Sequence, residues 1–219
     1  EPFIEFVNPE DRDDTKEAIS ALGLQRSLYD FKNRYRCKDG TYRWFEWRAT
    51  PSGKLIYAAA RDVTDRIQSA KELDDRLRFE TFLSELSRRF INIPGEQVDQ
   101  VINEAMQEIC DHLGFDLANL WQWTPGLSHR FTLTHLYRPL PGPPVPEEMD
   151  ARDVFPWCLE QLTDGKVIAV STDALPVEAL RDKEIWENYG IKSSLTFPLS
   201  AGGKPFIGAL GFNTIREKR

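Results

Sequence analysis

Residues that commonly bind metals or transfer protons are scattered along this sequence. His129 and His135 fall on one face of an expected strand, but at ~3.3 Å per residue they lie about 20 Å apart, too far to share one ion. One acidic cluster lies between a proline-rich loop and an expected helix: Glu147, Glu148, Asp150 and Asp153. A solvated face near the positive end of that helix explains the cluster without a metal. We therefore expect no metal site.

Catalytic motifs are missing as well. The sequence holds no G-x-S-x-G nucleophile motif, and Gly203, Gly208 and Gly211 have the wrong spacing for a dinucleotide loop. It also lacks the phosphoacceptor motif of histidine kinases and the Gly-Gly-Asp-Glu-Phe loop of cyclases. We therefore assign no catalytic residue and expect this chain by itself not to be an enzyme.

Aromatic residues are the strongest remaining candidates for a site. Trp121 and Trp123 share one face of an expected strand, and other aromatics lie on expected helices. Aromatic walls with a few polar groups suit an apolar or heterocyclic ligand. The candidate ligand-binding residues are Trp121, Trp123, Trp157, Thr172, Trp186, Tyr189 and Ser194. The same residues also suit an ordinary hydrophobic core, so both interpretations stay open.

The N-terminal elements predict a helix followed by a three-stranded meander. The helix covers about residues 9–22 and ends at Gly23, which tolerates left-handed geometry. Residues 28–37 alternate with the period of a half-buried strand. A two-residue turn at Asp39 and Gly40 then places Tyr35 opposite Trp44. The other two strands are expected over residues 42–50 and 54–61.

A long helix follows, and it begins near residue 62 and ends at Pro94. It carries two apolar stripes that are out of register, with a break near Leu77. The second stripe contains Phe79, Leu83, Leu86, Phe90 and Ile93.

The remaining residues predict an α+β domain with a central antiparallel sheet. Helices are expected over residues 96–113, 153–162 and 178–189. Strands are expected over residues 117–123, 130–137, 166–170, 193–200 and 205–212, with a proline-rich loop over residues 139–146.

Composition limits the possible partners. The 219 residues carry a net charge of −7, which disfavours a nucleic-acid or anionic-membrane partner, and no apolar run reaches the ~18–20 residues of a membrane helix. Three cysteines far apart (Cys37, Cys110 and Cys158) favour a reducing compartment. We expect a cytoplasmic chain, with room for a membrane anchor upstream in a longer parent.

The N-terminal part resembles PAS sensor domains in three motifs. Residues 8–12 resemble the His-Pro-Asp-Asp-Arg element, with Asn8 in place of the usual His. Residues 35–44 resemble the Lys-Asp-Gly hairpin, and residues 62–66 resemble the Asp-Ile-Thr-Glu-Arg exit motif. The resemblance implies that residues 1–66 are the C-terminal part of a PAS domain, whose first strands we expect upstream of Glu1. Half a domain cannot enclose flavin or haem.

The C-terminal part is similar to GAF domains. Residues 190–195 match a small-residue strand, Phe197-Pro198-Leu199 matches an x-P-L element, and residues 203–212 match a glycine hairpin followed by x-G-x-L-x-F. Residues 162–168 resemble the L…G-x-P-V element. The resemblance implies that residues 95–219 are a GAF domain without its last helix, whose sheet and flanking helices enclose a small-molecule pocket.

The cofactor expected from this resemblance is unknown. Bilin-binding GAF domains attach the chromophore to a cysteine commonly followed by His, whereas Cys158 is followed by Leu159 on an expected packing face. The Asn-Lys-x-x-x-Phe-x-x-x-Asp-Glu signature of cyclic-nucleotide GAF domains is also missing. We therefore expect no covalent bilin.

The connecting helix, residues 67–94, is similar to the signalling helices of such sensors. There, parallel helices of two subunits pack along an apolar seam, and a shift of one helix changes the output domain. We expect a homodimer through Phe79, Leu83, Leu86, Phe90 and Ile93. The alternative is that this stripe packs on the chain's own GAF sheet.

Together these features predict a fold in which a partial PAS meander and a long helix precede an antiparallel-sheet GAF domain with flanking helices. The expected function is the sensory module of a bacterial signal-transduction protein. It binds a small molecule or relays a signal through a dimeric helix to a downstream output domain, such as a histidine kinase or a cyclic-dinucleotide enzyme. The alternative is a ligand-free scaffold that only dimerises and relays.

Overall fold

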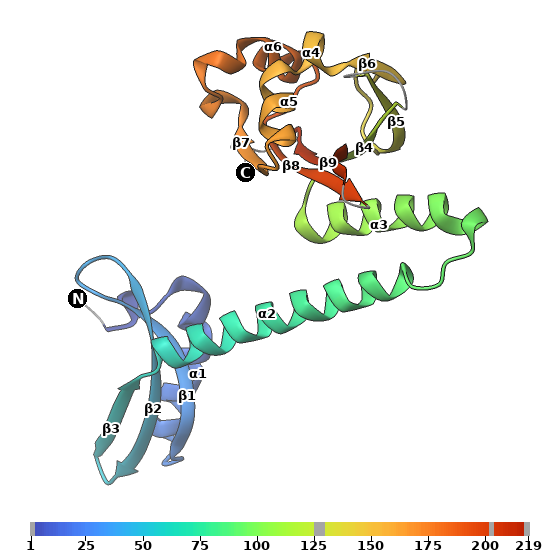
Figure 1. Cartoon of the computed structure of the whole chain (residues 1–219). Helices are drawn as coiled ribbons and strands as arrows, with labels where there is room; N and C mark the ends of the chain where they lie inside the picture. Colours follow the sequence, from blue (N-terminus) through green and yellow to red (C-terminus); the bar gives the residue numbers. More distant parts are fainter. Residues whose placement is uncertain (1–2, 125–129, 202–203, 217–219) are drawn as a thin grey trace. The chain divides into compact units, whose positions relative to one another are not determined.

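The chain forms two units in the computed structural model, which describes residues 3–124, 130–201 and 204–216 (Figure 1). Contacts divide it into Glu1–Glu85 and Leu86–Arg219. No helix in the described part of the chain combines the length and the apolar composition needed to cross a membrane.

The N-terminal unit begins with short 3-10 turns, Phe3–Glu5 and Pro9–Asp11, that lead into helix α1, Arg12–Gly23. The Asn8 side chain accepts a hydrogen bond from the Glu10 amide at 3.0 Å and so caps this start. The helix ends where expected, but Gln25 takes the left-handed conformation (φ 61°) that we predicted for Gly23.

Three antiparallel strands follow: β1 (Leu28–Arg36), β2 (Tyr42–Ser52) and β3 (Leu55–Asp62), in the order β1-β2-β3. The predicted two-residue turn is wrong. Residues 37–41 form a five-residue loop in which the Cys37 amide donates to the Thr41 carbonyl at 2.7 Å. Tyr35 therefore pairs with Arg43, and Arg34 pairs with Trp44. A shift of one residue moves a side chain to the other face of the sheet.

A buried asparagine joins α1 to this sheet. Asn33 donates to the Thr15 hydroxyl at 3.0 Å and accepts from the Trp47 indole at 2.8 Å. On the next residue, the Arg34 guanidinium donates to both oxygens of Asp11, the residue just before α1, at 2.9 and 2.6 Å. Hydrogen bonds between these polar groups hold the helix in one position on the strands.

Helix α2 covers Thr64–Arg89. The carboxylate of Asp62 accepts from the amide and the hydroxyl of Thr64, and that hydroxyl accepts from the Trp44 amide at 2.9 Å. The exit motif thus links β2 and β3 to the start of α2. The predicted end at Pro94 is wrong, because the helix stops at Arg89 and Asn92 is left-handed (φ 60°).

The C-terminal unit alternates helices with the strands of one sheet. Its helices are α3 (Val98–Leu113), α4 (Ala151–Val154), α5 (Pro156–Thr163) and α6 (Leu180–Asn188). Its strands are β4 (Leu117–Trp123), β5 (Arg130–Tyr137), β6 (Glu148–Asp150), β7 (Ile168–Ser171), β8 (Ser193–Ala201) and β9 (Lys204–Thr214). All pairings are antiparallel, in the order β6-β5-β4-β9-β8-β7.

Two details of this unit differ from expectation. The sequence pattern did not indicate the short strand β6, which pairs with the start of β5. The single helix expected over residues 153–162 is divided into α4 and α5 at Phe155, because Pro156 lacks the amide hydrogen that a continuous helix needs.

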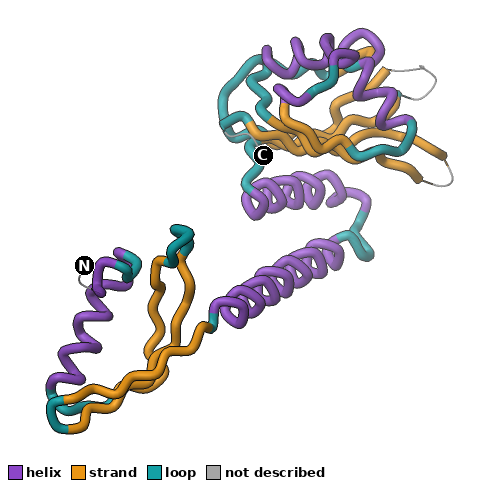
Figure 2. The backbone as a smooth tube through the Cα atoms, turned by 90° about the vertical axis from the view of Figure 1, so that its left-hand side faces the viewer, coloured by secondary structure: helices purple, strands orange, loops and turns teal. Residues whose placement is uncertain are grey.

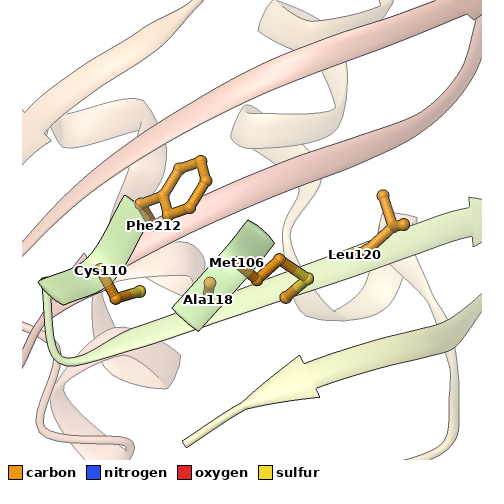
Figure 3. Close-up of a cluster of buried hydrophobic side chains, with 5 residues drawn as sticks. All are labelled: Met106, Cys110, Ala118, Leu120 and Phe212. Atoms are coloured by element: carbon orange, nitrogen blue, oxygen red, sulfur yellow. The ribbon is translucent and has the colours of Figure 1, made fainter. Parts of the chain in front are cut away.

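The sheet is covered on both faces (Figures 1 and 2). Helix α3 lies on one face, where Met106 and Cys110 pack against Ala118, Leu120 and Phe212 (Figure 3). Helices α4, α5 and α6 lie on the other face. Burial of an apolar side chain of this kind contributes roughly 1.5–3 kcal/mol, so this cluster anchors α3 firmly to the sheet.

A buried carboxylate holds the end of β9 against the start of β4. Asp116, only 3% exposed, accepts hydrogen bonds from the Ile215 amide at 2.7 Å and the Arg216 amide at 3.0 Å. It also accepts from the Arg216 guanidinium at 2.6 Å. Burial raises the pKa of this carboxyl, but the hydrogen bonds from Ile215 and Arg216 outweigh burial, and the net pKa lies below its usual value.

We expect Asp116→Asn to lower the free energy of unfolding by about 2 kcal/mol at pH 7, because charged hydrogen bonds are lost. A carboxyl whose pKa is lowered by folding stabilises the fold above its unfolded pKa of about 3.9 and loses this effect as the pH falls through the folded pKa. The difference between the two proteins should therefore shrink below pH 4. Urea unfolding across pH 3–7 measures it.

The control is Asp164→Asn, which removes an exposed ion pair with Lys166 and should change stability by less than about 0.5 kcal/mol. A difference between wild type and Asp116→Asn that is equal at pH 3 and pH 7 would contradict the role assigned to this carboxylate.

Candidate functional site

A cavity of about 130 Å³ lies in the C-terminal unit between the sheet and helices α4, α5 and α6. Its sheet side is formed by Trp121, Ser194, Thr196 and Ala209, among others. Its helix side includes Cys158, Leu159, Leu162 and Trp186. It is the best-formed pocket in the described part of the chain, so we take it as the candidate site.

Strand alternation decides which residues face this cavity. In β4, Asn119 and Trp121 line the cavity while Ala118 and Leu120 face α3. On β9, a Cβ atom at Gly211 would lie 2.8 Å from the Asn119 side-chain oxygen, closer than real Cβ contacts allow. Glycine at this position therefore leaves room for the polar floor of the cavity.

The lining combines apolar helices with a polar sheet surface. The hydroxyls of Ser194 and Thr196 are hydrogen-bonded to each other at 3.0 Å. Asn119 and Asn213 also line the cavity, and the Tyr189 hydroxyl donates to the Pro144 carbonyl at 3.4 Å. A mainly apolar pocket with a few polar groups is the usual composition of a small-molecule site.

The bulge in β5 changes which of its residues reach the cavity. Leu120 pairs with His135, but Trp121 pairs with Leu133, so Thr134 is an extra residue. As a result Phe131 lines the cavity before the bulge, and Leu136 and Arg138 line it after the bulge. His135 falls on the α3 side instead, where its Nε2 lies 3.2 Å from Asp99.

A buried aspartate positions the helix wall. Asp182 of α6 is fully buried and accepts hydrogen bonds from the first free amides of α5, those of Trp157 (3.2 Å) and Cys158 (2.9 Å). A carboxylate at a helix N-terminus satisfies amides that have no partner within the helix and interacts favourably with the helix dipole. This contact holds α5, and with it Leu159 and Leu162, against the cavity.

The Cys158 thiol lies on the cavity wall. Burial, reinforced by the neighbouring Asp182 carboxylate, raises the pKa of this thiol far above its usual value. Because its pKa is raised, Cys158 is a protonated thiol at neutral pH in this structure, whereas the thiolate is the reactive form of cysteine.

The structure brings together four of the seven candidate ligand residues: Trp121, Trp186, Tyr189 and Ser194 all line the cavity. The other three do not line it. Trp123 packs on Phe131 and Phe206, with ring centroids 5.2 and 5.5 Å away.

Trp157 packs at the edge of the Trp186 core cluster. Thr172 is buried, and its hydroxyl donates to the Ile191 carbonyl at 2.6 Å. The ligand-binding role of all seven residues stays a prediction.

Several lining residues were not predicted, although strand alternation indicates them. Every second residue of a strand lies on the same face, so Asn119 shares a face with Trp121, and Thr196 shares a face with Ser194. Arg138 is different, because it reaches the cavity only through the bulge at Thr134.

The described residues contain no group of three or more His, Cys, Asp or Glu side chains placed to hold a metal ion. His129, which was weighed as a metal ligand, lies outside the described residues.

Comparison with known families follows the same division of the chain. The model of the PAS fold matches residues 1–58, and the model of the GAF domain matches residues 97–217. The chain belongs to the GAF domain family. Its GAF domain is preceded by a partial PAS fold, as the motifs predicted, and neither kind of domain is catalytic in itself. No curated protein sequence matches the chain.

Solved structures share this fold at low sequence identity. The chromophore-binding domain of the Stigmatella aurantiaca bacteriophytochrome is 18% identical, with a TM-score of 0.51 over 100% of this chain and 75% of that one. A phycocyanobilin-bound GAF domain from a cyanobacterial phytochrome is 19% identical, with a TM-score of 0.51 over 64% and 81%. The phycoerythrobilin-bound form gives a TM-score of 0.50.

The exclusion of a bilin must be corrected. GAF domains of similar fold hold phycocyanobilin and phycoerythrobilin, so this fold is compatible with a bilin. The exclusion rested on Leu159 following Cys158 and on an expected packing face. In the structure Cys158 does lie in a helix, but that helix forms a wall of the cavity. One neighbouring residue type does not decide what the cavity holds.

With PAS and GAF domains in one chain, the protein is a sensory signalling module.

We expect Asp182→Ala to lower the free energy of unfolding by about 3 kcal/mol, because two amides of α5 lose their partner inside the protein. The control, Glu184→Gln on the same helix, removes only an exposed ion pair with Arg181 and should cost less than about 0.5 kcal/mol. Urea unfolding measures both. If Asp182→Ala unfolds at the same urea concentration as wild type, this carboxylate does not hold α5.

Proposed function

We propose that this chain is a sensory module whose GAF cavity binds a small ring-bearing molecule, and whose helix α2 forms a dimeric relay in a protein with a downstream output domain. The observation that carries the first half is the cavity of about 130 Å³ with aromatic and aliphatic walls over a polar sheet surface. Fold similarity to pigment-binding GAF domains supports the same conclusion.

The size of the cavity limits the ligand. An engineered apolar cavity of ~150 Å³ accommodates a single benzene ring, so the present cavity of about 130 Å³ suits a ligand with one ring. Trp121 and Trp186 on opposite walls offer ring faces for stacking.

A linear tetrapyrrole is the first larger candidate, because GAF domains of this fold hold bilins. Four rings exceed the present volume, so binding requires the loop over residues 139–146 to move outward. Val145 and Pro146 of this loop form part of the wall, and Cys158 is the thiol within reach of a bound pigment.

Ligand binding is tested by filling the cavity. Ala209 is 7% exposed and lies on the cavity floor, so Ala209→Leu places three more carbons inside. We expect wild type to bind benzamide in calorimetry and to develop a visible absorbance band with phycocyanobilin. Ala209→Leu should weaken both at least tenfold.

The matched control is Ala169→Leu, an exposed position on β7 next to the cavity residue Ile168, which should leave binding unchanged. Binding of benzamide alone would support ligand binding in the cavity and rule out a bilin as its ligand. Colour that survives denaturation and is lost in Cys158→Ser would assign a covalent bond. Binding of neither probe would contradict a ligand-sensing role and favour the ligand-free scaffold.

The second half of the proposal, a dimeric relay, is supported by the surface of α2. None of the 26 residues of this helix is buried. Large apolar side chains are exposed along it: Leu73 (58%), Leu77 (53%), Phe79 (40%) and Leu83 (44%). A second copy of the same helix covers such a stripe, as in a coiled coil.

The proposed seam is shorter than the one expected from the sequence. Phe79, Leu83 and Leu86 lie within α2, whereas Phe90 and Ile93 follow its last residue, Arg89. Helical packing between two copies therefore includes the first three residues of the predicted seam and not the last two.

We expect a homodimer in sedimentation equilibrium that Leu83→Asp converts to a monomer, since a charge in an apolar seam is desolvated without a partner. The control, Ser84→Asp, adds the same charge at the neighbouring exposed position and should leave the dimer intact. A wild-type chain that stays monomeric at high concentration would rule out the dimeric relay.

A further inference from the structure

We propose that the ligand of the GAF cavity carries a carboxylate that pairs with Arg138. This inference rests on the proposed ligand-binding function and narrows the class of ligand from ring-bearing molecules in general to aromatic or heterocyclic acids.

Arg138 differs from every other residue of the cavity in its charge. It is the one charged side chain among the described residues that line the cavity, which otherwise carry apolar groups, hydroxyls, amides and one thiol. A guanidinium stays protonated at any physiological pH, so this wall of the cavity is permanently positive.

The hydrogen-bonding capacity of this guanidinium is largely unused. Nη1 donates to the Pro143 carbonyl, but Nε is buried and has no hydrogen-bond partner. Within the described part of the chain no Asp or Glu forms an ion pair with Arg138. Leaving a buried donor without a partner costs about 1–3 kcal/mol, and more when the group is charged.

The backbone around Arg138 accommodates the guanidinium. The bulge at Thr134 turns Arg138 to the cavity side of the sheet. In the following loop, a Cβ atom on Gly142 would lie 1.3 Å from Nη2 of Arg138, so any larger residue there would displace the guanidinium. The loop thus holds the charged group beside the cavity while leaving Nε without a partner.

A carboxylate is the group that best completes this arrangement. Its two oxygens match the planar fork of donors on a guanidinium, and a pair with one positive and one negative charge leaves no net charge in the cavity. A phosphate dianion would leave a second negative charge, and within the described ranges no other cationic side chain lines the cavity to balance it.

The test compares two probes of nearly identical shape by calorimetry at pH 7: benzoate, which carries a carboxylate, and benzamide, which is neutral. We expect wild type to bind benzoate at least tenfold more tightly. Arg138→Gln should weaken benzoate at least tenfold and leave benzamide within twofold. The control, Arg130→Gln on the same strand, removes an exposed pair with Glu148 and should change neither.

Each outcome separates this inference from the function on which it rests. If both probes bind wild type equally, or if Arg138→Gln does not affect benzoate, the cavity binds ligands but the carboxylate pairing is wrong. If neither probe binds wild type, both proposals fail.

A second measurement needs no variant. The preference for benzoate over benzamide should disappear as the pH falls through the pKa of the probe's own carboxyl group. A preference that persists once the probe is protonated would overturn the pairing.

Discussion

The C-terminal unit depends on one constraint, which is that both faces of a six-stranded antiparallel sheet must be covered. Helix α3 covers one face with a closely packed cluster around Met106 and Phe212. Three short helices cover the other face, and they leave a cavity of about 130 Å³ above the middle strands. The candidate site is therefore the place where the covering layer is incomplete, and it has the rigid floor that a binding site requires.

Buried carboxylates hold this arrangement together across long distances in the sequence. Asp182 joins α6 to α5, and Asp116 joins the start of β4 to the end of β9, about a hundred residues later. Ile215 takes part in both the cavity and this second contact, since its side chain lines the cavity and its amide is held by Asp116. The cavity is thus adjacent to the end of the described chain, so a change in what occupies the cavity would act directly on this end.

Much of the fold follows from sequence pattern, and the exceptions have identifiable causes. The helix expected over residues 96–113 and the strand expected over residues 117–123 correspond to α3 and β4, and the motifs of residues 190–212 indicated the family. The hairpin register in the N-terminal unit was wrong, because the choice between a two-residue and a five-residue turn depends on the hydrogen bond from the Cys37 amide to the Thr41 carbonyl. The end of α2 was placed at Pro94, although the helix stops at Arg89, ahead of the left-handed Asn92.

The sequence by itself determined most of the elements, which residues are apolar, and that the nucleophile, dinucleotide-loop, phosphoacceptor and cyclase motifs are missing, because periodicity and motif spacing are local properties. Only the tertiary structure decided which side chains meet. An extra residue at Thr134 directs His135 toward α3 and Arg138 toward the cavity. Asp182 caps a helix that begins more than twenty residues earlier. Both depend on strand pairing and packing between distant segments, and local pattern contains no information about those contacts.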